Sequence, residues 1–272
     1  MNSMPVCATE ARPAPCLNRR PKAILIDLAG VLHVGEYPLP GAVEALSTLR
    51  AAGLPLRFLT NTTRSPRDRL VAQLQGMGLP VAAGEIQTAV HAAIQRVRQL
   101  GLHPHYLVHS GITGEVGTSH PQPDVVVLGD VGPELSFDAL NHAFRLLMQG
   151  LPLIAMARNR YFQESDGVTL DMGALVAALE FGSGVTAEVV GKPAPPFFLG
   201  ALAELCVAPG DAVLIGDDLR DDIGGAQAVH IPGVLVRTGK YRPQDERDDG
   251  IVPTAIVDDF AAAVRLLLAL PP

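Results

Sequence analysis

Short runs of aliphatic residues alternate along the chain with longer stretches whose apolar positions recur every three or four residues. The uninterrupted runs are typical of strands covered on both faces, and they lie at 24–28, 54–59, 106–108, 124–128, 151–155, 188–190, 212–215 and 234–236. The periodic stretches predict helices, at 42–52, 87–100, 137–149, 173–181, 197–205 and 260–270. A further helix is expected to begin at Ser65-Pro66, with Ser65 as its N-cap. Regular alternation of strands and helices predicts mainly parallel sheets.

The first apolar run is interrupted by one carboxylate, Asp27. An unpaired buried carboxylate costs several kcal/mol of folding free energy, so packing alone does not explain this residue. In open α/β sheets, ligands bind beyond the carboxyl ends of the strands, which is where a nucleophile or a metal ligand would lie. The alternative is that Asp27 caps the turn that follows the strand.

The order of the elements predicts an α/β fold in which a doubly wound, Rossmann-like parallel-sheet core is interrupted by a second strand–helix block. We assign 22–83 and 182–272 to the core and 84–181 to an inserted α/β cap domain with its own small sheet. Residues 1–21 are rich in Pro, Ala and small polar residues, which predicts a flexible N-terminal tail.

Composition narrows the possible partners. The chain has 272 residues, of which 48% are hydrophobic and 18% charged, so most of it can fold around a core. The net charge of −7 and the lack of a long basic run argue against nucleic acid or an anionic membrane as the main partner. No apolar stretch is long enough to cross a bilayer. The three cysteines, Cys7, Cys16 and Cys206, are expected to be free thiols in a reducing cytoplasm. Cys206 is expected to lie in the core.

Other predicted strand ends and turns carry polar side chains of a complementary kind, namely Thr60, Asn61, Lys192, Asp217, Asp218, Asp221 and Asp222. Several carboxylates that face one crevice repel each other and need a cation, and ligands that are all oxygen suit Mg²⁺. A hydroxyl, an amide and an ammonium group are donors suited to phosphate. Together with a carboxylate nucleophile, these groups indicate phosphoryl transfer through an aspartyl-phosphate.

Each residue also has a simpler reading. Thr60 and Asn61 are common turn formers, and a lysine such as Lys192 is usually a solvated surface residue. Asp221 fits a solvated charge at the start of a helix. The combination, and not any single residue, therefore carries the functional interpretation.

Four motifs occur in a fixed order, at residues 24–32 (ILIDLAGVL), 58–61 (FLTN), 191–193 (GKP) and 216–222 (GDDLRDD). In this order they resemble the haloacid dehalogenase-like hydrolase superfamily. The Thr-Asn pair and the inserted block resemble its NagD-type branch with a C2 cap. Within that branch the chain looks most similar to the group of the phospholysine phosphohistidine inorganic pyrophosphate phosphatase and the haloacid dehalogenase-like hydrolase domain-containing proteins. The resemblance extends from Lys22 to the end of the chain.

The resemblance implies a role for each motif residue. Asp27 would attack phosphorus, Mg²⁺ would be held by Asp27, the backbone carbonyl of Ala29 and Asp217, and Lys192 would neutralise the charge. The same resemblance implies that the substrate phosphate contacts Asp27, Ala29, Thr60, Asn61 and Lys192. Asp218 and Asp222 would orient the water ligands of the metal and Lys192.

The chain departs from the family pattern at Ala29, where most phosphatases of this superfamily carry an Asp that acts as general acid and base. Such catalysis is typically worth about 10²–10⁴-fold in rate. Two hypotheses follow. The first is a Mg²⁺-dependent phosphatase of a small phosphorylated compound such as pyrophosphate or a phosphoramidate. The second is a catalytically impaired phosphate-binding or regulatory protein. The retained Asp27, Lys192 and Asp217 favour the phosphatase.

The inserted block is expected to cover the crevice. Arg158, Asn159 and Arg160 follow one of its predicted strands, and they either contact the substrate or lie in a solvated loop. Relatives in this branch often form homodimers through the cap, and we carry this expectation over to the chain.

Overall fold

A computed structural model describes residues 17–164, 167–247 and 250–272 of the chain. Most of the predicted tail, with Cys7 and Cys16, lies outside the described residues. Within the rest of that segment, the backbone N–H of Arg20 donates to the carbonyl of Pro271 at 2.6 Å. Among the described residues, every helix is too short or too polar to span a lipid bilayer.

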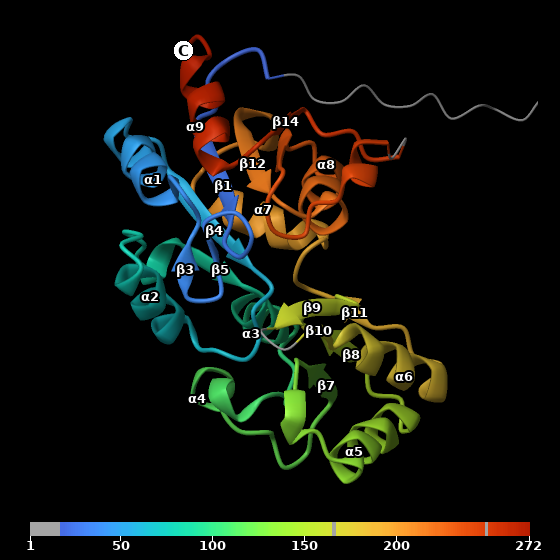
Figure 1. Ribbon diagram of the computed structural model, residues 1–272. Helices are drawn as coiled ribbons and strands as arrows, with labels where there is room; N and C mark the ends of the chain where they lie inside the picture. The colour runs from blue at the N-terminus through green and yellow to red at the C-terminus, as the bar shows by residue number, and fades with distance from the viewer. Residues whose placement is uncertain (1–16, 165–166, 248–249) are drawn as a thin grey trace, which may run out of the picture.

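The centre of the fold is a six-stranded sheet in which every neighbouring pair is parallel (Figure 1). Its spatial order is β14-β13-β12-β1-β4-β5. The strands are β1 (Ala23–Asp27), β4 (Leu56–Thr60), β5 (Ile86–Thr88), β12 (Ala212–Gly216), β13 (Gly233–Val236) and β14 (Ala255–Val257). The chain runs outward from β1 through β4 and β5 on one side, and from β12 through β13 and β14 on the other. The strand order therefore reverses between β1 and β12, which is where ligands bind in sheets of this kind.

Helices cover both faces of this sheet. One face packs against α1 (Ala42–Ala51), α2 (Arg67–Gly76) and α9 (Phe260–Ala269), and the other against α7 (Pro195–Ala203) and α8 (Gly225–Ala228). Side chains alternate along β1, so that Ile24 and Ile26 belong to the first core and Leu25 to the second. Burial on both faces explains why β1 is apolar up to its last residue.

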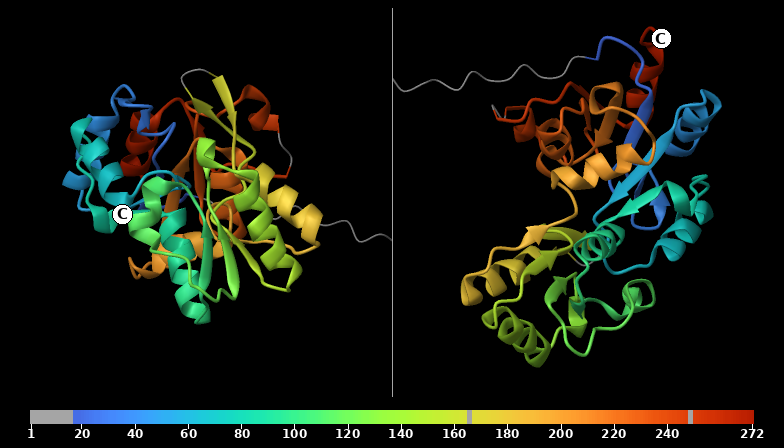
Figure 2. Two further views of the ribbon diagram at one scale, coloured as in Figure 1. Left: turned by 90° about the horizontal axis from the view of Figure 1, so that it is seen from below. Right: turned by 180° about the vertical axis from the view of Figure 1, so that it is seen from behind.

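A second, four-stranded parallel sheet has the order β11-β8-β7-β6 and lies below the first in Figure 1, an arrangement that the right-hand view of Figure 2 also shows. Its strands are β6 (Pro104–Leu107), β7 (Val125–Leu128), β8 (Leu153–Ala155) and β11 (Glu188–Val189). A separate hydrophobic core joins it to α3 (Ala89–Leu100), α5 (Phe137–Met148) and α6 (Gly173–Ser183). The described residues also form α4 (Thr113–Val116), several short 3-10 or π-helical turns and two antiparallel strand pairs, β2 (His33–Val34) with β3 (Tyr37–Pro38) and β9 (Tyr161–Glu164) with β10 (Gly167–Leu170).

The structure confirms the predicted α/β fold class but differs in local detail. The sequence assigns 86–88 to the inserted block and 188–189 to the core, yet β5 pairs with β4 and β11 pairs with β8. Because β5 belongs to the first sheet and β11 to the second, we place the two junctions between the core and the inserted unit elsewhere. One lies between β5 and α3, and the other lies just after β11. Both strands are very short, so their apolar residues do not reveal which neighbour they pair with.

Two further local predictions are wrong. Pro66, and not Ser65, is the N-cap residue of α2, without a side-chain capping hydrogen bond. Cys206 is exposed, and it has a positive φ of 55° shortly after α7. Its place in a turn beyond the helix removes it from the core that its apolar character predicted.

Candidate active site

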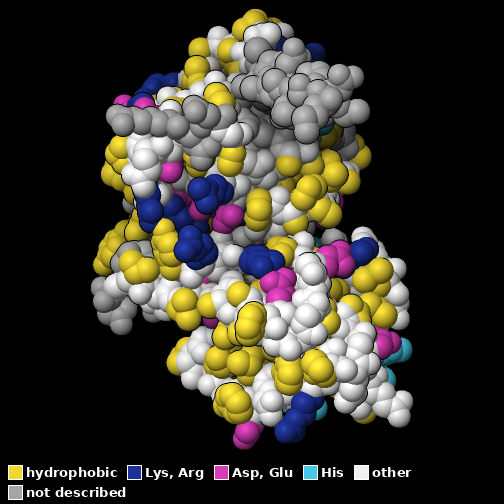
Figure 3. Space-filling model, turned by 90° about the vertical axis from the view of Figure 1, so that its right-hand side faces the viewer, with side chains coloured by type: hydrophobic (Ala, Val, Ile, Leu, Met, Phe, Trp, Pro, Cys, Tyr) yellow, Lys and Arg dark blue, Asp and Glu magenta, His cyan; other side chains and the backbone are white. Residues whose placement is uncertain are grey.

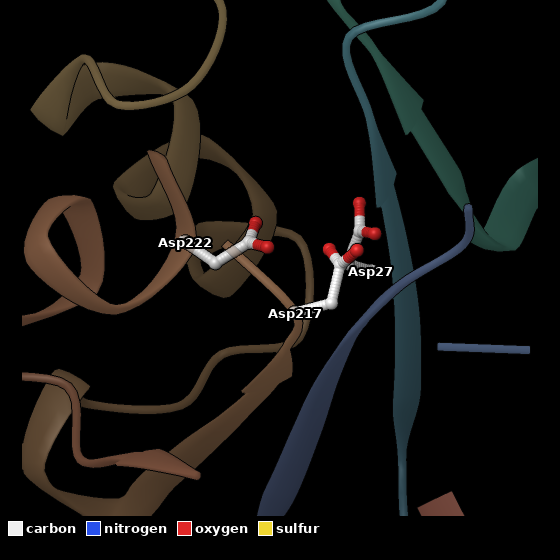
Figure 4. Close-up of side chains that lie close together, drawn as sticks. All are labelled: Asp27, Asp217 and Asp222. Atoms are coloured by element: carbon white, nitrogen blue, oxygen red, sulfur yellow. The ribbon is translucent and has the colours of Figure 1, made fainter. Parts of the chain in front are cut away.

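Three carboxylates from two neighbouring strands meet at the point where the strand order reverses. Asp27 is the last residue of β1, Asp217 follows β12, and Asp222 lies in the single-turn π-helix η5 (Leu219–Gly224). Their exposed fractions are 5%, 2% and 0%. One oxygen from each lies within 4.8 Å of the others, and Figure 4 shows the carboxyl group of Asp222 directed toward the other two.

Glycine permits this close approach. Gly30, three residues after the nucleophile candidate Asp27, has a φ of +89°, a conformation that residues with a Cβ rarely adopt. A Cβ on Gly30 would collide with the carboxylate of Asp217, and a Cβ on Gly239 would do the same. The positions of Gly30 and Gly239, which pack against the carboxylate of Asp217, therefore require a residue without a side chain.

Lys192 is the cation within this cluster. Its Nζ donates to Oδ1 of Asp27 and, at 2.7 Å, to Oδ1 of Asp222, and its side chain is only 7% exposed. Burial alone would lower the pKa of Lys192, but the charges of Asp222 and Asp27 outweigh it and raise that pKa, so Lys192 is an ammonium. The simpler reading of Lys192 as a solvated lysine is therefore wrong.

Burial and mutual repulsion raise the pKa values of two of these carboxyl groups. Burial raises the pKa of Asp222 to about 6, with the charge of Asp27 adding to the effect and Lys192 opposing it. Burial, followed by the charges of Asp27 and Asp222, also raises the pKa of Asp217 well above its usual value. Three carboxylates against one ammonium leave two negative charges in a buried space. A donor set of this composition fits a divalent metal ion.

The polar residues after β4 lie beside this cluster. Thr60 is buried, and its hydroxyl is 2.8 Å from that of Thr62 and accepts the backbone N–H of Thr62 at 3.1 Å. The side chain of Asn61 holds the backbone of Lys192: its Oδ1 accepts the N–H at 2.9 Å, and its Nδ2 donates to the carbonyl at 3.0 Å. The family resemblance implies a phosphate contact for Asn61, and the sequence gives no sign of this clamp.

Asp218 lies at the edge of the cluster. Its Oδ1 accepts the backbone N–H groups of Arg220 and Asp221, both at 2.9 Å, so it caps the turn that carries Asp222. Burial would raise the pKa of Asp218, but the N–H of Asp221 and the charge of Lys240 bring it below its usual value. Ala29, by contrast, is exposed, and its methyl group offers no proton donor.

Sequence reasoning missed Lys240. Its backbone N–H donates to Oδ2 of Asp217 at 2.7 Å, and its Nζ lies 3.5 Å from Oδ2 of Asp218. The sequence feature that could have identified Lys240 is its position in the segment that follows β13, because Asp217 also follows a strand of the same sheet, β12. Figure 3 shows Lys and Arg side chains gathered on one face where the two parts of the molecule meet, an arrangement that favours an anionic ligand.

Of the three residues predicted after β8, Arg160 is exposed, and Arg158 and Asn159 lie in different environments. Arg158 pairs with Glu180 of α6, with Nη1 donating at 3.0 Å, and stays within its own unit. Asn159 instead reaches the core, where it contacts Asn61 and Asp221. Asp221 is half-buried and bonded to Asn159, which rules out the simple solvated charge.

Comparisons with known proteins agree with this geometry. Residues 24–130 match the family model "Haloacid dehalogenase-like hydrolase", and residues 189–263 match the model "HAD-hyrolase-like". The phospholysine phosphohistidine inorganic pyrophosphate phosphatase of Danio rerio is 41% identical over 91% of this chain and 94% of its own length. The haloacid dehalogenase-like hydrolase domain-containing protein 2 of Rattus norvegicus is also 41% identical, over 91% of this chain and 96% of its own length.

Solved structures give the same picture. The p-nitrophenyl phosphatase from Archaeoglobus fulgidus superposes with a TM-score of 0.84 at 26% identity, covering 91% of this chain and 99% of its own. The glycerol phosphate phosphatase from Mycobacterium tuberculosis in complex with calcium has a TM-score of 0.80 at 28% identity, covering 89% of this chain and 74% of its own.

Proposed function

The chain belongs to the haloacid dehalogenase-like hydrolase family and is a phosphatase, and we propose that it hydrolyses small phosphorylated compounds with Asp27 as nucleophile and Mg²⁺ as cofactor. The observation that carries the proposal is the buried ammonium of Lys192 between Asp27 and Asp222, beside Asp217. A protein that only binds phosphate has no need of a carboxylate at the position where phosphorus would arrive.

The reaction consists of two displacements at phosphorus. A carboxylate oxygen of Asp27 attacks phosphorus, and the leaving group departs with the electron pair of its bond to phosphorus. Water then attacks the phosphorus of the aspartyl-phosphate, and the bond between phosphorus and the Asp27 oxygen breaks. Its electron pair restores the Asp27 carboxylate, and the proton of the attacking water leaves with the released phosphate or passes to solvent. Lys192 donates a hydrogen bond to Asp27 before attack and neutralises phosphoryl charge during both steps.

The metal and the phosphate would be held by different groups. Asp27, the backbone carbonyl of Ala29 and Asp217 would bind Mg²⁺, which neutralises negative charge and polarises a phosphoryl oxygen when bound. Asp218 and Asp222 would orient the groups around it. The hydroxyl of Thr60 and the backbone N–H of Asn61 would donate to phosphate oxygens from the end of β4.

Ala29 determines the proposed substrate class. Without an acid at this position, substrates whose leaving group departs without a proton from the enzyme are favoured. Pyrophosphate expels phosphate, and phosphohistidine or phospholysine expels a nitrogen that is already protonated. The name of the Danio rerio relative includes these compounds, and we propose the same class for this chain.

The nucleophile is tested with Asp27→Asn. We expect the wild-type protein to hydrolyse pyrophosphate and to bind beryllium fluoride with Mg²⁺ as an aspartyl-phosphate mimic, and we expect the variant to do neither. The matched control is Asp68→Asn, which changes an exposed carboxylate in the first turn of α2. Turnover by folded Asp27→Asn would show that another group attacks phosphorus.

A phosphate-binding or regulatory protein is the second candidate, and exposed Ala29 is the observation that favours it. It predicts beryllium fluoride binding without turnover of any compound in a panel of phosphorylated metabolites. A homodimer through the inserted unit and a cytoplasmic location stay predictions from the sequence, and sedimentation of the purified protein tests the first.

A further inference from the structure

Asn159 is a residue of the inserted unit whose side chain contacts the core segments beside the catalytic cluster. It lies between β8 and β9 and is half-buried. Its Nδ2 donates to Oδ2 of Asp221, and its Oδ1 accepts from Nδ2 of Asn61 at 3.0 Å. One amide from the inserted unit thus contacts two separate loops of the core.

The hydrogen-bond partners fix the orientation of both amides. A carboxylate such as Asp221 is an acceptor when ionised, so the NH₂ group of Asn159 must face it. The oxygen of Asn159 therefore faces Asn61, whose own NH₂ group also donates to the carbonyl of Lys192. The oxygen of Asn61 accepts the N–H of Lys192 at 2.9 Å. Donors and acceptors match at every contact from Asp221 to Lys192.

We propose that Asn159 is a positioning residue, which couples closure of the inserted unit to the placement of Lys192 through Asn61. The inference rests on the proposed function, because Lys192 is the cation beside the nucleophile Asp27. With the unit closed, Asn159 holds the Asn61 amide in the orientation that clamps the backbone of Lys192. With the unit open, the amide loses one of its three partners and the clamp loosens.

Asp130 makes a second set of hydrogen bonds between the two parts. The backbone N–H of Asp130 donates to Oγ1 of Thr63 at 3.2 Å, and Nε of Arg64 donates to Asp130 at 2.6 Å. These contacts hold the unit near the loop after β4. The contact through Asn159 differs because it continues to the catalytic lysine, so its loss should affect the rate as well as closure.

Direct recognition of substrate by Asn159 is the competing role. Both ends of its amide are engaged by the protein, with Asp221 on one side and Asn61 on the other. A residue that reads one substrate would change the relative rates of different substrates. A residue that positions Lys192 lowers kcat for all of them by a similar factor.

A charge-exchange cycle tests the proposal. Asn159→Asp brings a second carboxylate against Asp221, and we expect kcat to fall about ten- to hundredfold, in line with typical coupling between contacting residues. Asp221→Asn should change kcat less than about threefold, because the two amides can still pair. In the double variant the exchanged groups match again, and Asp at position 159 still accepts from Asn61, so kcat should recover to within about threefold of the wild type.

Closure is measured on the same proteins by small-angle X-ray scattering. We expect the radius of gyration to rise in Asn159→Asp and to return in the double variant. Arg158→Ala is the matched control, since Arg158 pairs with Glu180 inside its own unit, and it should match the wild type in both measurements.

Each other outcome overturns the proposal. No recovery in the double variant would show that the two side chains are not partners. A change in scattering with unchanged kcat would show that closure is not coupled to Lys192, and a change confined to one substrate would favour direct recognition. If the wild type hydrolyses nothing, the proposed function fails, and the affinity for beryllium fluoride is measured in place of kcat. The coupling is then overturned if this affinity does not follow the pattern expected of kcat across the wild type, the two single variants and the double variant.

Discussion

Replacing Lys192 by Met removes the positive charge from the buried cluster while keeping a side chain of similar length. In the metal-free wild-type protein, the ammonium contacts Asp27 and, at 2.7 Å, Asp222, and it is 7% exposed. The variant leaves these carboxylates next to Asp217 without a protein cation in contact. The structure therefore predicts a loss of stability and a stronger dependence on divalent metal.

The size of the effect follows from burial. Removing one partner of a buried ion pair typically costs about 3–5 kcal/mol of unfolding free energy. Burial already raises the pKa of Asp222 to about 6, so this carboxyl can take up a proton when Lys192 is lost, which limits the cost. We expect a loss of about 3 kcal/mol, which corresponds to a fall in Tm of about 6–12 °C in a protein of this size.

The assay is thermal unfolding of the metal-free protein, followed by titration with Mg²⁺. The matched control is Lys240→Met, which removes a second ammonium near the same carboxylates. That side chain is 46% exposed and 3.5 Å from Asp218, so its removal should cost less than about 1 kcal/mol. Mg²⁺ should raise Tm more in Lys192→Met than in the wild type, because more uncompensated negative charge remains.

Equal losses of stability in the two variants would refute the reasoning, since burial would then not distinguish the two lysines. A Mg²⁺ response in Lys192→Met that is no larger than in the wild type would refute the charge argument. Loss of phosphatase activity is expected in Lys192→Met in either case, and it does not by itself decide the electrostatic question.

Three further predictions concern the metal and the leaving group. Asp217→Asn should abolish most of the rise in Tm that Mg²⁺ produces in the wild type, and an equal rise in thermal unfolding would place the metal elsewhere. The same rise should grow as the pH increases from about 5 to about 7, because burial raises the pKa of Asp217 and that of Asp222, and protons compete with the metal until these groups ionise. In metal-free protein the neutral form of Asp222 stabilises the fold below the ordinary pKa of a carboxyl group, and this contribution is lost as the pH rises through about 6. A Mg²⁺-dependent rise in Tm that is independent of pH would therefore contradict the assignment. Ala29→Asp should speed hydrolysis of alkyl phosphates about 10²-fold or more and flatten the dependence of rate on leaving-group pKa, and an unchanged slope in a leaving-group series would argue that another group supplies the proton.

Sequence alone was sufficient for the fold class and for the strand-end positions. A run of aliphatic residues predicts a buried strand from local composition, and a carboxylate within such a run has no packing role. Parallel strands place their carboxyl ends at one edge, so Asp27 and Asp217 could be expected together without knowledge of the contacts. The order of the four motifs then indicated the family that the comparisons confirm.

Only the tertiary structure decided which side chains meet across the junction of the two units. Asn61 clamps Lys192 from 131 positions away and contacts Asn159 from 98 positions away, whereas Arg158, next in sequence to Asn159, pairs with Glu180 in its own unit. Local patterns set the period of each helix and strand, but they carry no information on the distance between atoms of different elements. That distance depends on sheet order, on register and on how the inserted unit sits on the core, and a hydrogen bond is lost when any of these shifts by an ångström or two.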